Sequence, residues 1–131
     1  MSNITIGMTA TATTTVVTEN TAKVMKSGAL DVFATPAMCA LMEEAAQAAV
    51  APVLESGQGT VGISLSITHD APSPLGATIT ATAEVTAVDG RKITFTITAT
   101  DNHGHIGKGT HERFIIDNEK FMAKVTEKAT K

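Results

Sequence analysis

The segment at residues 36–51 is predicted to be a helix with almost no polar face, and this feature constrains the fold most. Its apolar side chains recur at helical spacing and extend around the side of the helix. They are Met38, Leu41, Met42, Ala45 and Ala49 in the central stripe, with Cys39, Ala46 and Val50 beside it. A helix this apolar is usually enclosed on several sides. We therefore expect a sheet that wraps it and a second copy of the chain that covers the rest, a homodimer being the simplest case.

Both ends of this helix carry the expected signals. Thr35 suits the N-cap position and Pro36 suits the first helical position. Pro52 is expected to end or kink the helix, and Gly57 and Gly59 to make the turn that follows.

After the helix, the apolar residues change from helical spacing to alternation, which is typical of strands with one buried face. Three alternating rows cover residues 61–67, 79–87 and 93–99. The dipeptide Asp89-Gly90, between the second and third rows, is a strong hairpin signal. Connections this short join antiparallel strands.

Two further strands complete the expected sheet. The Thr-rich residues 8–18 favour an extended strand, and a last strand is expected over about 105–116. Residues 19–34 are expected to form a loop with a short helical turn, and the Lys-rich tail is expected to fray. The sequence thus predicts a single α+β domain over residues 1–131, with one long helix wrapped by a five-stranded antiparallel sheet.

Composition excludes several classes of function. The net charge is −3, Lys and Arg are scattered and aromatic residues make up only 3%, so we expect no nucleic-acid partner. No stretch approaches the roughly 18 apolar residues of a membrane span. No secretion signal is recognisable either, so we expect a cytoplasmic protein without a membrane partner. The single cysteine, Cys39, excludes an internal disulfide, and the histidines lack metal-ligand spacing, so no metal is expected.

A hydroxyl, a carboxylate and an imidazole carry the candidate chemistry. Thr35 opens the helix, Glu43 lies within it at the edge of the apolar stripe, and His69 ends the next strand on its helix side. Such a set supplies the nucleophile or base and the proton transfer that hydrolysis of an activated acyl group needs. Each residue also has a plain structural interpretation, as a helix cap, an exposed carboxylate or a hydrogen-bonded histidine. The helix alone does not choose between Glu43 and Glu44.

The other histidines are expected to be peripheral. His103 and His105 lie at a turn and are expected to be solvated. His111, on the last strand with Glu112 and Arg113, is interpreted as surface charge.

Six short segments, in this order and spacing, resemble the fluoroacetyl-CoA thioesterase-like branch of the hotdog-fold thioesterases. The segments are VFATP (32–36), MEEAA (42–46), TVG (60–62), THDAPSPLG (68–76), VDGR (88–91) and IGKGTHER (106–113). The resemblance covers about residues 30–117 and implies a dimeric hotdog protein. It also implies hydrolysis of an acyl-CoA or related thioester to a carboxylic acid and a free thiol. No cofactor is implied other than the coenzyme A that forms part of the substrate.

The resemblance further implies roles for individual residues. It places Thr35, Glu43 and His69 on catalytic positions near the subunit interface, and so favours Glu43 over its neighbour. Gly62 matches the backbone position that faces the thioester carbonyl, and Arg113 matches a supporting basic position on the substrate side.

The segment before the helix departs from this branch. Its namesake carries an aromatic lid there, whereas residues 19–32 of this chain contain no aromatic residue. The sequence therefore leaves open whether fluoroacetyl-CoA is a substrate, which acyl group is cleaved, and whether CoA or a carrier protein bears it. A non-catalytic acyl-thioester binding module and a structural partner of another hotdog subunit stay open as alternatives, as does a dimer of dimers.

Overall fold

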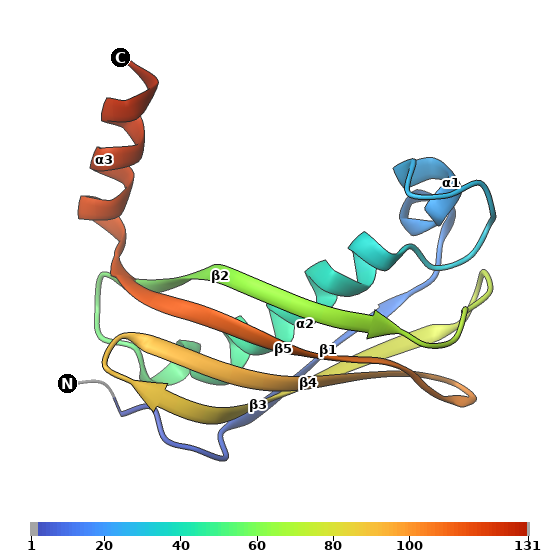
Figure 1. The fold of residues 1–131 in the computed structure, drawn as a ribbon, viewed down its shortest axis with the longest axis horizontal. Coiled ribbons are helices and arrows are strands. Elements are labelled where there is room, and N and C mark those ends of the chain that lie inside the picture. Colours follow the sequence, from blue (N-terminus) through green and yellow to red (C-terminus); the bar gives the residue numbers. More distant parts are fainter. Residues whose placement is uncertain (1–2, 131) are drawn as a thin grey trace.

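The computed structural model describes residues 3–130 and shows a long helix, α2 (Thr35–Val50), lying against a curled antiparallel sheet (Figure 1). The strands of this sheet are β1 (Thr9–Thr15), β2 (Gln58–His69), β3 (Thr78–Asp89), β4 (Lys92–Asp101) and β5 (Gly104–Asp117). Their order across the sheet is β1-β3-β4-β5-β2, so β1 and β2 are its two edges. The predicted α+β architecture, with one long helix and five antiparallel strands, is confirmed.

The core lies between α2 and the inward rows of the central strands. The buried residues of α2 are Met38, Leu41, Met42, Ala45, Ala46, Ala49 and Val50. Opposite them, the fully buried residues of β3 and β4 are Ile79, Ala81, Ala83, Val85, Ile93, Phe95, Ile97 and Ala99. Alanines on both surfaces allow the helix backbone to approach the sheet closely, which gives the dense packing of protein interiors.

Two tight turns connect the central strands, as the sequence predicts. Residues 90–91 join β3 to β4, since Asp89 pairs directly with Lys92. Gly90 has φ +62°, a conformation in which glycine has no steric penalty. Residues 102–103 join β4 to β5 in the same way, with Asp101 paired to Gly104.

Within residues 3–130, four further helical segments accompany α2, and one of them corrects the prediction of a frayed tail. They are η1 (Thr18–Asn20), α1 (Ala22–Met25), η2 (Ala51–Val53) and α3 (Asn118–Ala129). The tail folds into α3 because the Asp117 carboxylate caps it, accepting the backbone N–H of Lys120 at 3.1 Å. No residue of α3 is buried, and the helix projects away from the sheet (Figure 1). Within residues 3–130, no helix is both long and apolar enough to cross a membrane.

Strand β2 is a long edge strand with an irregularity in its middle. It pairs with β5 along one side, and the register shifts between Gly62 and Ser64. Its other side has no strand partner in the described chain. Ile63, at the irregularity, is 51% exposed. An unprotected edge of this kind is a template for pairing with another strand.

Candidate active site

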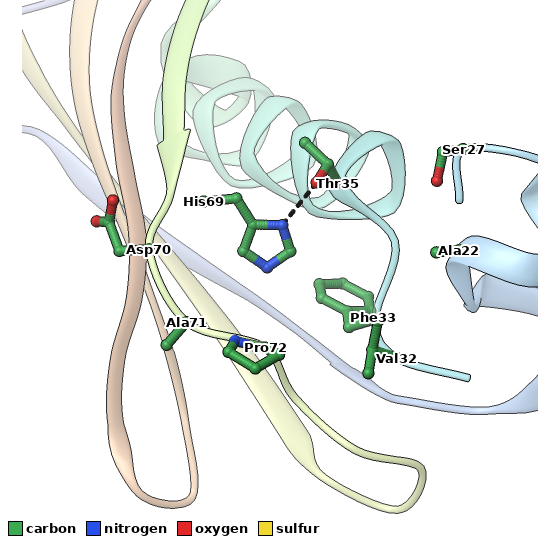
Figure 2. Close-up of a pocket in the computed structure, with 9 residues that line it drawn as sticks. All are labelled: Ala22, Ser27, Val32, Phe33, Thr35, His69, Asp70, Ala71 and Pro72. Atoms are coloured by element: carbon green, nitrogen blue, oxygen red, sulfur yellow. Dashed lines mark hydrogen bonds between the residues drawn. The ribbon is translucent and has the colours of Figure 1, made fainter. Parts of the chain in front are cut away.

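Thr35 and His69 are brought together where α2 begins and β2 ends. The Oγ1 atom of Thr35 lies 2.7 Å from Nδ1 of His69, within hydrogen-bond distance (Figure 2). The predicted N-cap role of Thr35 is wrong. Ala34 is the N-cap, because its carbonyl accepts the first helical hydrogen bond from Met38, and no side chain caps this end. The Thr35 hydroxyl is therefore available to His69.

The segment before α2 is held in place by backbone hydrogen bonds. Phe33 donates its N–H to the carbonyl of Ser73 at 2.9 Å, and Ala34 donates to that of Asn20 at 2.9 Å. These bonds keep the chain extended up to Ala34, so the helix starts at Thr35. The position of the hydroxyl thus depends on contacts that are distant in sequence.

A cavity of about 280 Å³ opens beside this pair. Its lining residues are Ala22, Ser27, Val32, Phe33, Thr35, His69, Asp70, Ala71 and Pro72 (Figure 2). The second imidazole nitrogen of His69, Nε2, is buried and has no hydrogen-bond partner among the described residues. Figure 2 shows it pointing into the space between Phe33 and Pro72. A buried polar atom without a partner is costly unless a ligand or water satisfies it.

Burial also sets the charge state of His69. Desolvation lowers the pKa of its imidazole from the ordinary 6.5, and the nearby carboxylate of Asp70 opposes this only in part. The ring is therefore predominantly neutral at pH 7, and it carries one proton that it can donate and one lone pair that can accept another.

Glu43 belongs to a second cluster, two helical turns further along α2. Its Oε2 atom lies 3.6 Å from Nη1 of Arg113 and 4.0 Å from Nε2 of His111. The carboxylate side chain is 44% exposed, whereas the Arg113 side chain is 7% exposed. Arg113 is fixed by Thr60, donating its Nε–H to Oγ1 at 2.8 Å and an Nη2–H to the backbone carbonyl at 2.9 Å.

Gly62 on β2 leaves room for the Glu43 carboxylate. A Cβ atom at this position would lie 2.6 Å from Oε2 of Glu43 and 3.2 Å from Cε1 of His111. The first of these distances is shorter than any normal contact, so only glycine allows the carboxylate to lie where it does. Gly62, Glu43, His111 and Arg113 are hereafter called the Glu43 cluster.

Within one chain, the Thr35–His69 pair and the Glu43 cluster do not contact each other. Within residues 3–130, no hydrogen bond or ion pair links Glu43 to Thr35 or His69, and Glu43 does not line their cavity. Eight positions on a helix correspond to about 12 Å of axial rise, which separates Glu43 from Thr35. Gly62 and His69 lie toward opposite ends of β2. The structure thus brings Thr35 to His69, and Glu43 to Gly62 and Arg113.

The prediction that His111 contributes surface charge is wrong, because only 1% of this residue is exposed. It occupies the inward row of β5 with Arg113 and Ile115, which are also buried. The alternation of β5, continued back from Ile115 through Arg113, places His111 in the same buried row. His105 lies in solvent as expected, and its Nε2 pairs with Oδ2 of Asp70 at 2.7 Å.

The remaining candidate groups show no metal site. No group of three or more His, Cys, Asp or Glu residues in the part of the chain described here is arranged to hold a metal ion. Cys39 lies one turn before Glu43, and partial burial, followed by the charge of Glu43, raises the pKa of its thiol.

The chain is similar to proteins of known activity. Residues 5–119 match the family model described as "Fluoroacetyl-CoA-specific thioesterase". A fluoroacetyl-CoA thioesterase from Streptantibioticus cattleyicolor is 48% identical over 98 residues, which are 75% of this chain and 70% of that protein.

Two solved structures share the whole fold, including its hotdog architecture. One is a mutant of the fluoroacetyl-CoA-specific thioesterase FlK in complex with fluoroacetate and CoA. It has a TM-score of 0.84 and 39% identity, covering 90% of this chain and 99% of that one. The other is a thioesterase superfamily member from Thermus thermophilus, with a TM-score of 0.92 and 26% identity over 99% of this chain and 96% of that one. The family match spans most of the chain, and the chain therefore belongs to the fluoroacetyl-CoA-specific thioesterase family.

Proposed function

We propose that this thioesterase hydrolyses an acyl-CoA to a carboxylic acid and free CoA, with Thr35, Glu43 and His69 acting at the interface of a homodimer. The observation that carries the proposal is the Thr35–His69 pair, in which a buried imidazole nitrogen faces a cavity without a partner. The named relatives, one of them solved with fluoroacetate and CoA, support CoA as the thiol carrier. The cytoplasmic location stays a prediction, as does the absence of a resident cofactor.

In this proposal, each group has a separate chemical task. Glu43 attacks the thioester carbonyl or activates a water molecule that does so. The N–H of Gly62 stabilises the oxyanion that develops, and Arg113 supports the carboxylate. The C–S bond then breaks, and His69 delivers a proton to the departing CoA thiolate while Thr35 holds the ring in position. Water supplies the oxygen and both hydrogens that the products gain.

The separation of the two groups within one chain supports a site shared between two chains. The free edge of β2 suits antiparallel pairing with the β2 strand of a second copy about a two-fold axis. Such pairing reverses the strand, so the end of β2 that carries His69 comes to lie beside the Gly62 half of the other copy. The Thr35–His69 pair of one subunit would then face the Glu43 cluster of its partner. A dimer of dimers would preserve this arrangement.

The residues that line the cavity indicate only broadly which acyl groups the enzyme accepts. No aromatic residue from positions 19–32 enters the cavity, where Ala22, Ser27 and Val32 provide small side chains. We therefore propose that the enzyme accepts acyl groups other than fluoroacetyl.

A thiol-release assay tests the function. Purified protein is mixed with fluoroacetyl-, acetyl-, branched-chain and aryl-CoA, and free CoA is measured. We expect hydrolysis of at least one of these, and loss of roughly 100-fold or more in kcat for Glu43→Ala and His69→Ala.

Matched controls make the result specific. Glu44→Ala removes the neighbouring exposed carboxylate and His103→Ala an exposed histidine, and both should hydrolyse at the parental rate. Binding of acyl-CoA without release of thiol would support the non-catalytic alternative. Parental rates for both Glu43→Ala and His69→Ala would refute the proposed roles.

A further inference from the structure

His111 is a buried histidine that the proposed mechanism does not use. Its Nδ1 atom lies 2.8 Å from the backbone carbonyl of Ser64, and its Nε2 lies 3.2 Å from Nη1 of Arg113. A carbonyl oxygen only accepts and a guanidinium only donates. His111 must therefore carry its proton on Nδ1 and accept with Nε2, which makes it a neutral imidazole of one defined tautomer.

The surroundings of His111 favour this neutral state. The ring is stacked on Phe95, with centroids 5.9 Å apart, and only 1% of the residue is exposed. Desolvation lowers its pKa from 6.5, and the positive charge of Arg113 acts in the same direction, while the Ser64 carbonyl and Glu43 oppose them.

The hydrogen-bond donors of Arg113 are divided between two neighbours, Thr60 and His111. Thr60 takes the Nε–H and one Nη2–H, which fixes the plane of the guanidinium. His111 takes an N–H from Nη1, the nitrogen that faces Glu43. The distance from Nη1 to Oε2 of Glu43 is 3.6 Å, which is longer than a charge-assisted hydrogen bond of about 2.7–2.9 Å. Glu43 therefore receives the field of the arginine without a hydrogen bond from it.

We infer that His111 is a positioning residue: by accepting one of the two N–H groups of Arg113 Nη1, it helps Thr60 to hold the guanidinium 3.6 Å from Oε2 of Glu43, so that the arginine does not bond tightly to Glu43 and the carboxylate oxygens stay free to react. The inference rests on the proposed role of Glu43. A carboxylate bound to a guanidinium by a short hydrogen bond is a weaker nucleophile and a weaker base, because the bond stabilises its ground state. His111 acts on the reaction only through Arg113.

Two amide substitutions separate the two hydrogen bonds of His111. The amide of His111→Asn overlies Nδ1, so it keeps the donor to Ser64 but has no acceptor within reach of Arg113. The amide of His111→Gln overlies Nε2 and keeps an acceptor for Arg113 but loses the donor to Ser64. Thermal unfolding of both variants is measured beside the kinetics.

We expect His111→Asn to lower kcat by about tenfold or more, with KM changed less than about twofold. His111→Gln should keep kcat within about threefold of the parent. Equal losses for the two variants, or a larger loss for Gln, would overturn the inference.

A measurement on the unmodified protein tests the same geometry without any variant. The ¹⁵N chemical shifts of the His111 ring should show a protonated Nδ1 and a bare Nε2 at neutral pH. The opposite tautomer would overturn the inference, because a protonated Nε2 cannot accept from Arg113. Failure of the proposed function would be seen differently, as hydrolysis that does not depend on Glu43.

Discussion

The hydroxyl of Thr35 is free to bond to His69 because Ala34, and not Thr35, is the N-cap of α2. Ala34 provides the first carbonyl of α2, and the Thr35 hydroxyl lies 2.7 Å from His69. Thr and Ser are common helix caps that contribute about 1 kcal/mol. A threonine placed one residue inside the helix contributes little of this, so its hydroxyl is better explained by the site than by the helix.

Substitution of Thr35 separates activity from stability. Thr35→Val keeps the shape of the side chain and removes the hydroxyl, so we expect kcat/KM to fall roughly tenfold or more. The free energy of unfolding should change by less than about 1 kcal/mol, since no cap is lost. Thiol release and chemical unfolding measure the two quantities, and Thr35→Ser should retain activity. A parental rate together with a stability loss typical of a lost cap would contradict this assignment.

At the scale of elements, the site depends on how closely α2 approaches β2. Gly62 is the point of contact, since a side chain there would collide with the Glu43 carboxylate. Gly59 lies on the same strand, and a Cβ there would meet only the flexible end of the Asn118 side chain at the start of α3. The two glycines form a matched pair on one element.

Alanine substitution on β2 tests this contact. Gly62→Ala should displace the Glu43 carboxylate and lower kcat by about tenfold or more, with the protein still folded. Gly59→Ala should displace Asn118 and leave kcat unchanged. Circular dichroism checks the fold and thiol release measures the rate. Equal kinetics for the two variants would show that the position of Glu43 does not depend on Gly62.

The elements themselves could largely be predicted from the sequence, because their signals are local. The apolar stripe of α2 and the alternation of β3 and β4 each need only a few neighbouring residues. The predicted start of α2 differs by one residue from the observed one, because hydrogen bonds from Phe33 and Ala34 to distant carbonyls set it. The sequence predicts a frayed tail instead of α3, although Asp117 is a recognisable helix cap. The network of His111 with Arg113 could not be predicted, because it needs the phase of β5 and the position of Thr60.

At the scale of the whole molecule, the partly buried His69 and the buried His111 make the fold sensitive to acid. Burial lowers the pKa of both His69 and His111 from 6.5 in the folded chain. Below about pH 6.5, the unfolded chain therefore binds more protons than the folded one, and the free energy of unfolding decreases as the pH is lowered. The pKa values of Asp70 and Asp101 are lowered from 3.8, so these carboxyl groups affect stability only at pH values near and below 3.8. The pH range in which the two histidines act lies above this.

Unfolding measurements at fixed protein concentration test this dependence. The free energy of unfolding should decrease as the pH is lowered from about 7.5 to 5. The decrease should be smaller for His111→Gln, because this variant lacks one of the two titrating groups. His103→Ala, which removes an exposed histidine, should follow the parent. A parent that becomes more stable as the pH falls through this range would contradict the buried neutral state of both rings.

The complete site is a property of two chains in this account. A mixed dimer tests it most directly, with one chain carrying Thr35→Val and His69→Gln, the other Glu43→Gln, and a different affinity tag on each. Each variant homodimer should be inactive, whereas the doubly purified mixed dimer should recover roughly half of the parental rate, because one of its two sites is intact. A mixed dimer as inactive as both homodimers would show that Thr35, His69 and Glu43 act within a single chain, and would contradict the shared site.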